Sequence, residues 1–414
     1  MNKGFQYTLY PNNKQSTRMF QIAGATRYAY NWALDFTMKY FEENHKFISP
    51  NDITKEFTKH KREDDNKWLY TIPNNTLKQS VKNAAQTVID VYMSNKENHT
   101  NNEPHFKRKF KAEPTIYLDS NQIEFTKNSV KLDKISLSRK SNRIKLNYVR
   151  LSKKHNIPIG LKSYQNPTVK FVDNKWVVSV SIELPDTHEP DTCIIPENLA
   201  NDGIGIDLGI KELAVCSNGD VFENINKTPK VRKLEKLHRH RQRKFSKKLE
   251  NNKVGNKVAY SKNMIKQKDK MHKLDIRLKN IRNNYIYQSV NKIIKQKPSF
   301  ISIEDLNIRG MMKNKHLSKA IQNQKLYFFK TVLTYKCNWH DIPLAVIDRW
   351  YPSSKKCSCC GNIYKNLKLK DRTYNCSVCG ISLDRDYNAS INIKNEGFRI
   401  LKEQYLQAQL ALNN

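Results

Sequence analysis

The sequence predicts an α+β multidomain protein, in which a helical region and a small β-barrel precede a mixed sheet with an inserted metal-binding module. Three observations lead to this fold class. Apolar spacing changes between a helical and a strand period along the 414 residues, glycines concentrate in one short segment, and five of the eight cysteines lie within 23 residues. A chain of this length can hold two to four domains of about 100–200 residues each.

Residues 1–10 are expected to form a strand, and residues 11–109 a helical region. Apolar residues in the first long segment recur at three- and four-residue steps, which places them on one helical face. They are Met19, Ile22, Ala25, Ala29, Trp32 and Phe36. A second helix is expected from about Asn75. Tyr28, Tyr30 and Trp32 beside Arg27 could stack on nucleic-acid bases, but aromatics in such a stripe more often belong to a core, which we favour.

Residues 110–190 alternate apolar and polar positions and are rich in β-branched residues, which is typical of strands. The clearest segments are Thr115–Leu118, Ile144–Val149 and Trp176–Leu184. With residues 1–10 they predict a small antiparallel β-barrel. The proline-rich stretch Pro185–Pro196 that follows has the composition of a linker.

Residues 203–350 are expected to form a mixed sheet. Four of the twelve glycines lie between residues 203 and 219, and Asn218-Gly219 is a strong hairpin signal. Short buried strands are expected at Phe300–Leu306 and Leu344–Asp348, with a helix at about Ser318–Asn338 between them. This order of hairpin, strand and helix fits a sheet of the ribonuclease H type.

The segment 227–282 carries 21 Lys and Arg against four acids, and its apolar residues keep a helical rhythm. It predicts a basic helical hairpin over residues 227–297 with one apolar seam. A solvated face is usually mixed in sign, so we favour contact with phosphates. The candidate contacts are Arg232, Lys233, Arg239, Arg241, Arg243 and Lys244.

The whole chain has 74 Lys and Arg against 39 Asp and Glu, a formal net charge of +35. Such a charge indicates a polyanionic partner, and nucleic acid is favoured over a membrane surface because no single basic amphipathic anchor stands out. No apolar run approaches the roughly 20 residues of a membrane-spanning helix, and the N-terminus lacks a signal-peptide core. We therefore expect a cytoplasmic, nucleoid-associated protein without a membrane partner.

The cysteine cluster has the spacing of a structural zinc site. Two Cys-x2-Cys pairs, each followed by glycine, are separated by 15 residues and predict a zinc module over residues 351–380. The expected ligands are Cys357, Cys360, Cys376 and Cys379. Cys359 lies inside the first pair and is not expected to bind the metal.

Three acids lie at the ends of expected elements: Asp207 on the glycine-rich strand, Glu304 at the end of a buried strand, and Asp386 at the start of a helix. A carboxylate on a buried apolar strand is costly unless it is paired or bound to a metal. If the three converge, they would hold two Mg²⁺ ions about 4 Å apart, an arrangement that cleaves phosphodiesters. Each acid alone is weak evidence, and the hypothesis rests on the three together.

Five motifs, in family order and spanning about residues 5 to 395, resemble those of the TnpB proteins of insertion sequences. They are Arg27–Leu34, Gly205–Gly209, Ile303–Asn307, Tyr351–Cys357 and Asp384–Ala389. The resemblance implies a RuvC-like nuclease core over residues 203–350 and 381–395, the zinc ribbon, the helical recognition region and a wedge-like barrel, with a tail at 396–414. It also implies RNA-guided cleavage of double-stranded DNA beside a short flanking motif. In this family the catalytic acids match Asp207, Glu304 and Asp386, and Asp384 is the competitor for the third position.

Three alternatives stay open at this point. A compact type V CRISPR effector shares the same core, and only the genomic neighbourhood separates it from a transposon-borne nuclease. A regulator that binds nucleic acid without cutting would use the acids structurally, and a transposase would itself join strands. We favour the guided nuclease, acting as a monomer with a guide RNA and a double-stranded DNA target.

Overall fold

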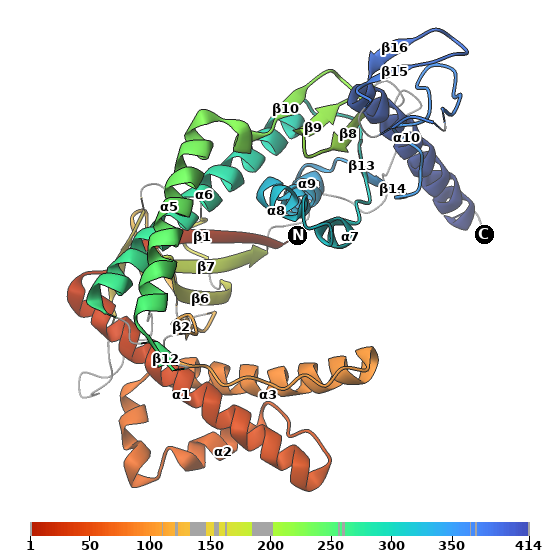
Figure 1. Ribbon diagram of the computed structural model, residues 1–414. Helices are drawn as coiled ribbons and strands as arrows, with labels where there is room; N and C mark the ends of the chain where they lie inside the picture. The colour runs from red at the N-terminus through yellow and green to blue at the C-terminus, as the bar shows by residue number, and fades with distance from the viewer. Residues whose placement is uncertain are drawn as a thin grey trace. The chain divides into compact units, whose positions relative to one another are not determined.

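The computed structural model describes residues 2–109, 111–120, 123–132, 146–152, 157–161, 164–183, 202–255, 257–258, 261–364, 366–368 and 371–412. The chain divides into two compact units, residues 1–189 and 190–414. Figure 1 shows the elements of both. Within the described residues, no helix is both long enough and apolar enough to cross a membrane.

The first unit contains the helical region. Its elements are α1 (Asn13–Asn44), α2 (Asp52–His60), a 3-10 helix η1 (Asp64–Thr71) and α3 (Asn74–Asn98). Helix α1 begins with a capping box, in which Asn12 and Gln15 each accept a hydrogen bond from the other's backbone. The apolar face of α1 packs on α3, and Met19, Ile22 and Ala29 are buried there. Both helices expected from periodicity are therefore confirmed.

The aromatic residues of the Arg27–Leu34 motif belong mostly to this core. Tyr30 is buried, whereas Tyr28 and Trp32 are half-buried. Trp32 stacks on the ring of His60 with 4.9 Å between centroids, and the Tyr28 hydroxyl lies 2.9 Å from Nε2 of the same histidine. The core interpretation is confirmed for Tyr30.

A seven-stranded antiparallel sheet completes the first unit. Its strands are β1 (Asn2–Tyr10), β2 (Thr115–Tyr117), β3 (Glu124–Phe125), β4 (Ser129–Lys131), β5 (Tyr148–Leu151), β6 (Gln165–Val172) and β7 (Lys175–Glu183). Their order is β2-β6-β7-β1-β5-β4-β3. Strand β1 thus lies in the middle of a sheet whose other strands come from residues 115–183. This agrees with the prediction that residues 1–10 and 110–190 form one β-structure.

Two expectations for this sheet meet the limits of the description. The strand expected at Ile144–Val149 is β5, which begins at Tyr148, while residues 133–145 lie outside the described residues. Among the described residues the edge strands β2 and β3 do not pair, so closure of the sheet into a barrel stays a prediction. The linker Pro185–Pro196, with Cys193, also lies outside the described part of the chain.

The second unit is built on a five-stranded mixed sheet. Its strands are β8 (Ile204–Leu208), β9 (Glu212–Cys216), β10 (Val221–Glu223), β13 (Ile301–Glu304) and β14 (Leu344–Ile347). The order is β10-β9-β8-β13-β14, in which β8, β9 and β10 are antiparallel neighbours and β13 runs parallel to both β8 and β14.

Helices cover both faces of this sheet. Helices α6 (Lys262–Lys295) and α9 (Leu326–His340) bury their apolar residues against Ile206 and Ile303 on one face. Helix α10 (Arg385–Leu412) crosses the other face and contacts β8, β13 and β14. It lies so close to β8 that a Cβ at Gly205 would be 2.1 Å from the Ser390 carbonyl oxygen, which explains why glycine occupies this strand position.

The second unit has eight further helices and strands among the described residues. They are η2 (Ile225–Lys227), α5 (Pro229–Asn251), β11 (Lys253–Val254), β12 (Lys257–Val258), α7 (Ile308–Met312), α8 (Ser318–Gln324), β15 (Thr373–Asn375) and β16 (Ser382–Asp384). Helix α5 packs along α6 through Val231, Leu234, Leu274 and Leu278, which is the expected apolar seam, and Figure 1 shows the two helices side by side. The single helix expected at 318–338 is instead two helices, because Lys325 adopts a left-handed conformation with φ 55°.

Candidate functional site

The parallel pairing of β8 and β13 brings two of the predicted acids together. Ile206 of β8 lies opposite Ile303 of β13. The residues that follow them, Asp207 and Glu304, therefore lie side by side near the carboxyl ends of these two strands. Both side chains share the sheet face of Gly205 and Ser302 because side chains alternate along a strand. That is the face covered by α10, whose first turn carries Asp386.

The pKa of Asp207 reflects both its burial and the acids around it. Burial raises the pKa of Asp207 well above its usual value, and the negative charges of Glu304, Asp386 and Asp384 raise it further, against a lowering by Arg385. Burial also raises the pKa of Glu304, offset in part by a hydrogen bond that the Ser353 hydroxyl donates to its carboxylate. Burial and neighbouring like charges both favour the protonated form of a carboxyl group, so the ionised form of Asp207 is costly without a compensating positive charge.

The acids are less tightly clustered than the cysteines. Within the described residues, the four cysteines are the group whose ligand atoms all lie within 4.8 Å of one another, and the three carboxylates do not form such a group. A cavity of about 790 Å³ opens beside the start of α10, with Lys211, Glu212, Asp384, Asp386 and Tyr387 in its lining. There is thus room for a bound group next to Asp386.

Asp384 and Asp386 have different surroundings. One carboxylate oxygen of Asp384 accepts hydrogen bonds from the backbone N–H groups of Asp386, at 2.9 Å, and Tyr387, at 3.1 Å, so Asp384 caps the first turn of α10. Asp386 is half-buried, and its carboxylate lies 3.9 Å from the Arg372 guanidinium. Asp384 is thus engaged in capping the helix, whereas Asp386 is not, and of the two acids Asp386 has the larger effect on the pKa of Asp207.

Two buried asparagines of α10 hold the segment before the cysteines. Asn392 donates to the carbonyl oxygens of Ser353, at 2.8 Å, and Lys356, at 2.6 Å. Asn388 donates to the Lys356 carbonyl at 2.8 Å and accepts from the Ser358 N–H at 3.0 Å. This clamp fixes Ser353 beside Glu304. Sequence reasoning missed Ser353, Asn388 and Asn392 as site residues, although Ser353 and Asn388 lie inside the recognised motifs and Asn392 follows the last of them by three residues.

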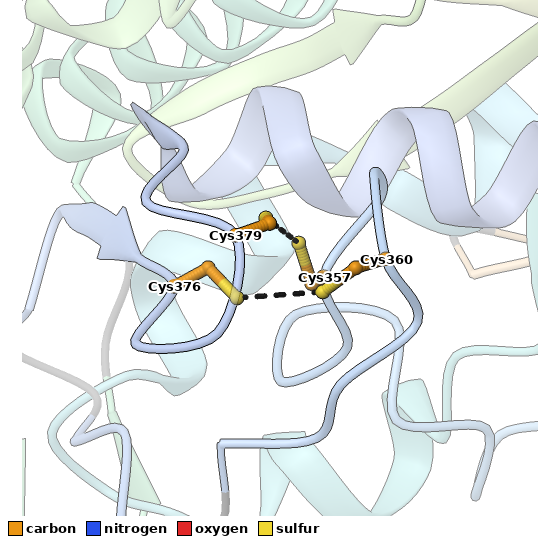
Figure 2. Close-up of side chains that lie close together, drawn as sticks. All are labelled: Cys357, Cys360, Cys376 and Cys379. Atoms are coloured by element: carbon orange, nitrogen blue, oxygen red, sulfur yellow. Dashed lines mark hydrogen bonds between the residues drawn. The ribbon is translucent and has the colours of Figure 1, made fainter.

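The four cysteines form the module that the spacing predicts, as Figure 2 shows. The Sγ atoms of Cys357 and Cys379 are 3.6 Å apart, and those of Cys360 and Cys376 are 3.5 Å apart. Each Cys-x2-Cys segment, Cys357–Cys360 and Cys376–Cys379, forms a tight turn that is followed by a glycine with positive φ. The φ angles are 76° at Gly361 and 74° at Gly380. Four thiol groups at these distances suit a tetrahedral structural zinc.

The odd cysteine is separate from this cluster. Cys359 is exposed and is not among the four clustered residues. The strands β15 and β16 pair next to the cluster, and the second of them runs directly into α10. The cysteine module therefore sets the start of the helix that carries Asp386.

Five of the six cations proposed on α5 are exposed. They are Arg232, Lys233, Arg239, Arg243 and Lys244. Arg241 differs, because its guanidinium donates a hydrogen bond of 3.0 Å to the Lys270 carbonyl on α6. Arg241 is thus placed to hold the two helices together.

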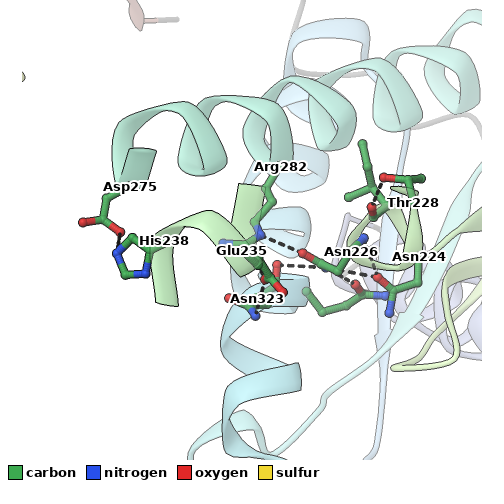
Figure 3. A network of polar contacts seen from close by, with 10 residues as sticks. Asn224, Asn226, Thr228, Glu235, His238, Asp275, Arg282 and Asn323 are labelled. Atoms are coloured by element: carbon green, nitrogen blue, oxygen red, sulfur yellow. Dashed lines mark hydrogen bonds and ion pairs between the residues drawn. The ribbon is translucent and has the colours of Figure 1, made fainter. Parts of the chain in front are cut away.

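Further polar contacts tie the hairpin to the sheet unit (Figure 3). Arg282 of α6 donates to Glu235 of α5 at 2.6 Å and to Asn226 at 2.7 Å, and Asn323 also donates to Glu235 at 3.3 Å. His238 Nε2 lies 2.8 Å from an Asp275 carboxylate oxygen, without the geometry of a hydrogen bond. These contacts fix the direction in which the exposed cations of α5 are presented.

Comparison with known protein families gives three matches along the chain. A model described as "Helix-turn-helix domain" of OrfB_IS605 matches residues 1–46, the OrfB_IS605 model described as "Probable transposase" matches residues 179–315, and the model "Cas12f1-like, TNB domain" matches residues 327–393. The last of these contains the four cysteines and Asp386.

Two curated relatives resemble the chain over nearly its whole length, and a third resembles about half of it. A "Putative RNA-guided DNA endonuclease" of Streptomyces pristinaespiralis is 26% identical over 95% of this chain and 89% of that protein. The "Putative RNA-guided DNA endonuclease InsQ" of Escherichia coli K12 is 25% identical over 96% of this chain and 93% of that protein. A "CRISPR-associated endodeoxyribonuclease Cas12f1" of Sulfoacidibacillus thermotolerans is 30% identical over 53% of this chain and 50% of that protein.

Solved structures give weaker likenesses. The chain in "Structure of the mini-RNA-guided endonuclease CRISPR-Cas_phi3" is 12% identical, with a TM-score of 0.47 over 96% of this chain and 92% of that one. The chain in "Cryo-EM structure of the Cas12f1-sgRNA-target DNA complex" is 16% identical, with a TM-score of 0.34 over 95% of this chain and 99% of that one.

Proposed function

Because the chain belongs to the IS605 OrfB family of TnpB proteins, we propose that it is an RNA-guided, Mg²⁺-dependent endonuclease. It cleaves double-stranded DNA beside a short flanking motif. Two relatives that match this chain over 89% and 93% of their own length are named putative RNA-guided DNA endonucleases. The net charge of +35 suits a protein that holds both a guide RNA and a DNA target.

The observation that supports the proposal is that Asp207 and Glu304 lie on the sheet face covered by α10, and that the first turn of this helix carries Asp386. Asp207, Glu304 and Asp386 come from segments up to 179 residues apart in the sequence, and the charges of Glu304 and Asp386 add to burial in raising the pKa of Asp207. In this sheet β10, β9 and β8 are antiparallel neighbours, and β13 and β14 run parallel to β8. This is the order of ribonuclease H-type nucleases. We therefore propose a RuvC-like core over residues 203–350 and 381–395.

The three carboxylates would hold two Mg²⁺ ions. When bound, Mg²⁺ supplies a water nucleophile at neutral pH and stabilises charge on the leaving oxygen in phosphodiester cleavage. The donor set fits, because Mg²⁺ prefers carboxylate oxygens and neutralises charges that otherwise repel. Ser353 positions Glu304 through its hydroxyl, and the Asn388 and Asn392 clamp holds Ser353 in place.

The cysteine module serves the core as a structural zinc ribbon over residues 351–380. It supplies folding energy rather than chemistry, since four cysteine ligands leave no open position on the metal. The remaining parts serve recognition: the helical region at 11–109 and the wedge-like barrel at 1–10 and 110–190 read the flanking motif and hold the guide. The exposed cations of α5, within the basic hairpin at 227–297, contact phosphates.

A compact CRISPR effector is the second candidate, because Cas12f1 relatives match about half of this chain. The presence of a repeat array or of transposon ends beside the gene distinguishes the two. The family match to a transposase model also keeps strand joining and cleavage-free regulation as outcomes of the test below.

The test uses protein purified with its copurifying RNA, and a plasmid that carries the matching target beside randomised flanks. Asp207→Ala, Glu304→Ala and Asp386→Ala should each abolish cleavage while target binding survives, because each removes a ligand and leaves the basic surface intact. Asp384→Asn is the matched control: it removes a neighbouring carboxylate but keeps an oxygen that can cap α10, so cutting should persist. Cutting by the Asp386 variant together with loss in the Asp384 variant would exchange their roles.

A further inference from the structure

A second cavity lies in the first unit, in the helical region. It has a volume of about 980 Å³ and opens between α1, the 3-10 helix η1, and the residues Lys109 and Pro114. The α1 residues in its lining recur at helical spacing and so occupy one face of that helix. The main lining residues are Phe20, Gly24, Arg27, Tyr28, Trp68 and Lys109.

Two partly exposed aromatic rings line the cavity. Phe20 is 42% exposed, and its ring lies 4.9 Å from those of both Phe171 and Trp176, which hold it in place. Trp68 is 45% exposed and lies 5.5 Å from Tyr28 in an edge-to-face contact. Fixed rings with free area are platforms on which a flat group stacks.

The charge of the lining is positive. Among the described residues that line it, the charged ones are Arg27 and Lys109, and none is an acid. Arg27 is half-buried, and its guanidinium has no hydrogen bond or ion pair with any of the described residues. A partly desolvated arginine without a protein partner is suited to bind an anionic group of a ligand, and phosphate matches its planar donor geometry.

Gly24 gives an independent indication. It lies in the interior of α1, where glycine is less favourable than alanine. A Cβ built at Gly24 would meet no atom within 4 Å, so the packing of this chain does not require glycine there. The missing side chain leaves the floor of the cavity open, which is what close approach of a ligand to the helix needs.

We propose that this cavity binds one unstacked nucleotide of a bound single-stranded nucleic acid. The base stacks against Phe20 or Trp68, and the phosphate pairs with Arg27. The inference rests on the proposed function for the class of ligand and adds to it a specific site. Among ligands of a strongly basic protein, a nucleotide combines a flat base, which suits the exposed rings of Phe20 and Trp68, with a phosphate, which suits Arg27.

The experiment uses the full-length protein, stripped of nucleic acid at high salt, and fluorescently labelled oligonucleotides of uridine or deoxyuridine that carry 5-iodouracil. Gly24→Leu should fill the cavity and weaken binding about tenfold, as expected for loss of one stacked base. Gly24→Ala adds a single methyl group and should bind like wild type. Ultraviolet crosslinks should map to Trp68, Tyr28 or Phe20 and disappear in Gly24→Leu. Crosslinking of the RNA probe alone assigns the guide, and of the DNA probe alone the target strand.

Thermal unfolding keeps the test interpretable. Since a Cβ at position 24 meets open space, and alanine and leucine both favour a helix more than glycine does, both variants should unfold at or above the wild-type temperature. Arg27→Gln provides a second route, with the same loss of affinity and no filled volume. A folded Gly24→Leu protein with unchanged affinity for both probes and unchanged crosslinks would overturn the inference while leaving guided cleavage intact. Absence of all nucleic-acid binding would instead overturn the proposed function together with it.

Discussion

Removing charge from the outer stripe of α5 should flatten the salt dependence of nucleic-acid binding by a predictable amount. Arg232, Arg239 and Arg243 are spaced seven and four residues apart, so they lie on one face of the helix, and all three are exposed. The buried residues Val231 and Leu234 face α6 instead. The stripe is therefore available to phosphates.

The magnitude follows from counterion release. Each phosphate contact contributes about 0.7 to the slope of log affinity against log salt for a single strand, and about 0.9 for a duplex. Replacing three contacting arginines by glutamine should thus lower the slope by about 2.1–2.7. A fourfold rise in salt would then weaken the triple variant roughly 20- to 40-fold less than it weakens wild type.

The assay is fluorescence anisotropy of labelled guide RNA and target DNA at salt concentrations between about 50 and 200 mM, a range over which such slopes can be determined. Arg241→Gln is the matched control on the same helix. It breaks the hydrogen bond to Lys270, which should cost about 1 kcal/mol of stability and leave the slope unchanged. The flanking-motif preference should also stay the same in the triple variant. An unchanged slope in the triple variant would make the stripe a solvated surface, and a changed flank preference would place motif reading on α5.

Three further outcomes are expected. Purified protein should contain about one zinc by elemental analysis, and the Cys357→Ser variant should lose the zinc and unfold at a lower temperature. The Cys359→Ser variant should behave like wild type, because Cys359 is exposed and outside the cluster. Active protein without zinc would contradict this. Asn392→Ala should lower the free energy of unfolding by about 1–3 kcal/mol in urea titrations, because it removes the donor to the buried Ser353 carbonyl oxygen and one of the two donors to the Lys356 carbonyl. A neutral result would remove the clamp from the account. The raised pKa of Asp207 means that the Mg²⁺-free folded state holds a proton that the unfolded state releases, so stability falls as pH rises from the ordinary value of about 3.9 through the raised one. Asp207→Asn should therefore raise the melting temperature of Mg²⁺-free protein at pH 7, and added Mg²⁺ should stabilise wild type more than the variant; equal melting temperatures would argue against a buried charge.

Local patterns were sufficient where one segment determines its own structure. The periodicity of α1 and α3, the cysteine spacing and the glycine at position 205 all reflect constraints within a few residues or against one close neighbour. The register that sets Asp207 beside Glu304 could also be anticipated, because parallel strands end at the same edge.

The remainder depends on contacts between distant segments. The periodic stretch from Ser318 contains no glycine or proline, yet it breaks at Lys325, where the Gln324 side chain donates to the Gly209 carbonyl from another part of the sheet. The choice between Asp384 and Asp386 depends on which of them caps α10, and the role of Ser353 depends on a clamp from Asn392. Arg241 differs from its neighbours only through the carbonyl of Lys270. None of these partners is visible from spacing along one sequence.

The most direct test of the central claim is guided cleavage with the protein's own RNA. The RNA that copurifies with the full-length chain is sequenced, its 3′ segment is used to design a plasmid target, and linearisation is measured with Mg²⁺ beside the Asp207→Ala variant. The account predicts linear plasmid only when guide and target match, and none with Asp207→Ala or with a chelator in place of Mg²⁺. Cleavage that ignores the guide, or that persists at full rate in the Asp207→Ala protein, would contradict it.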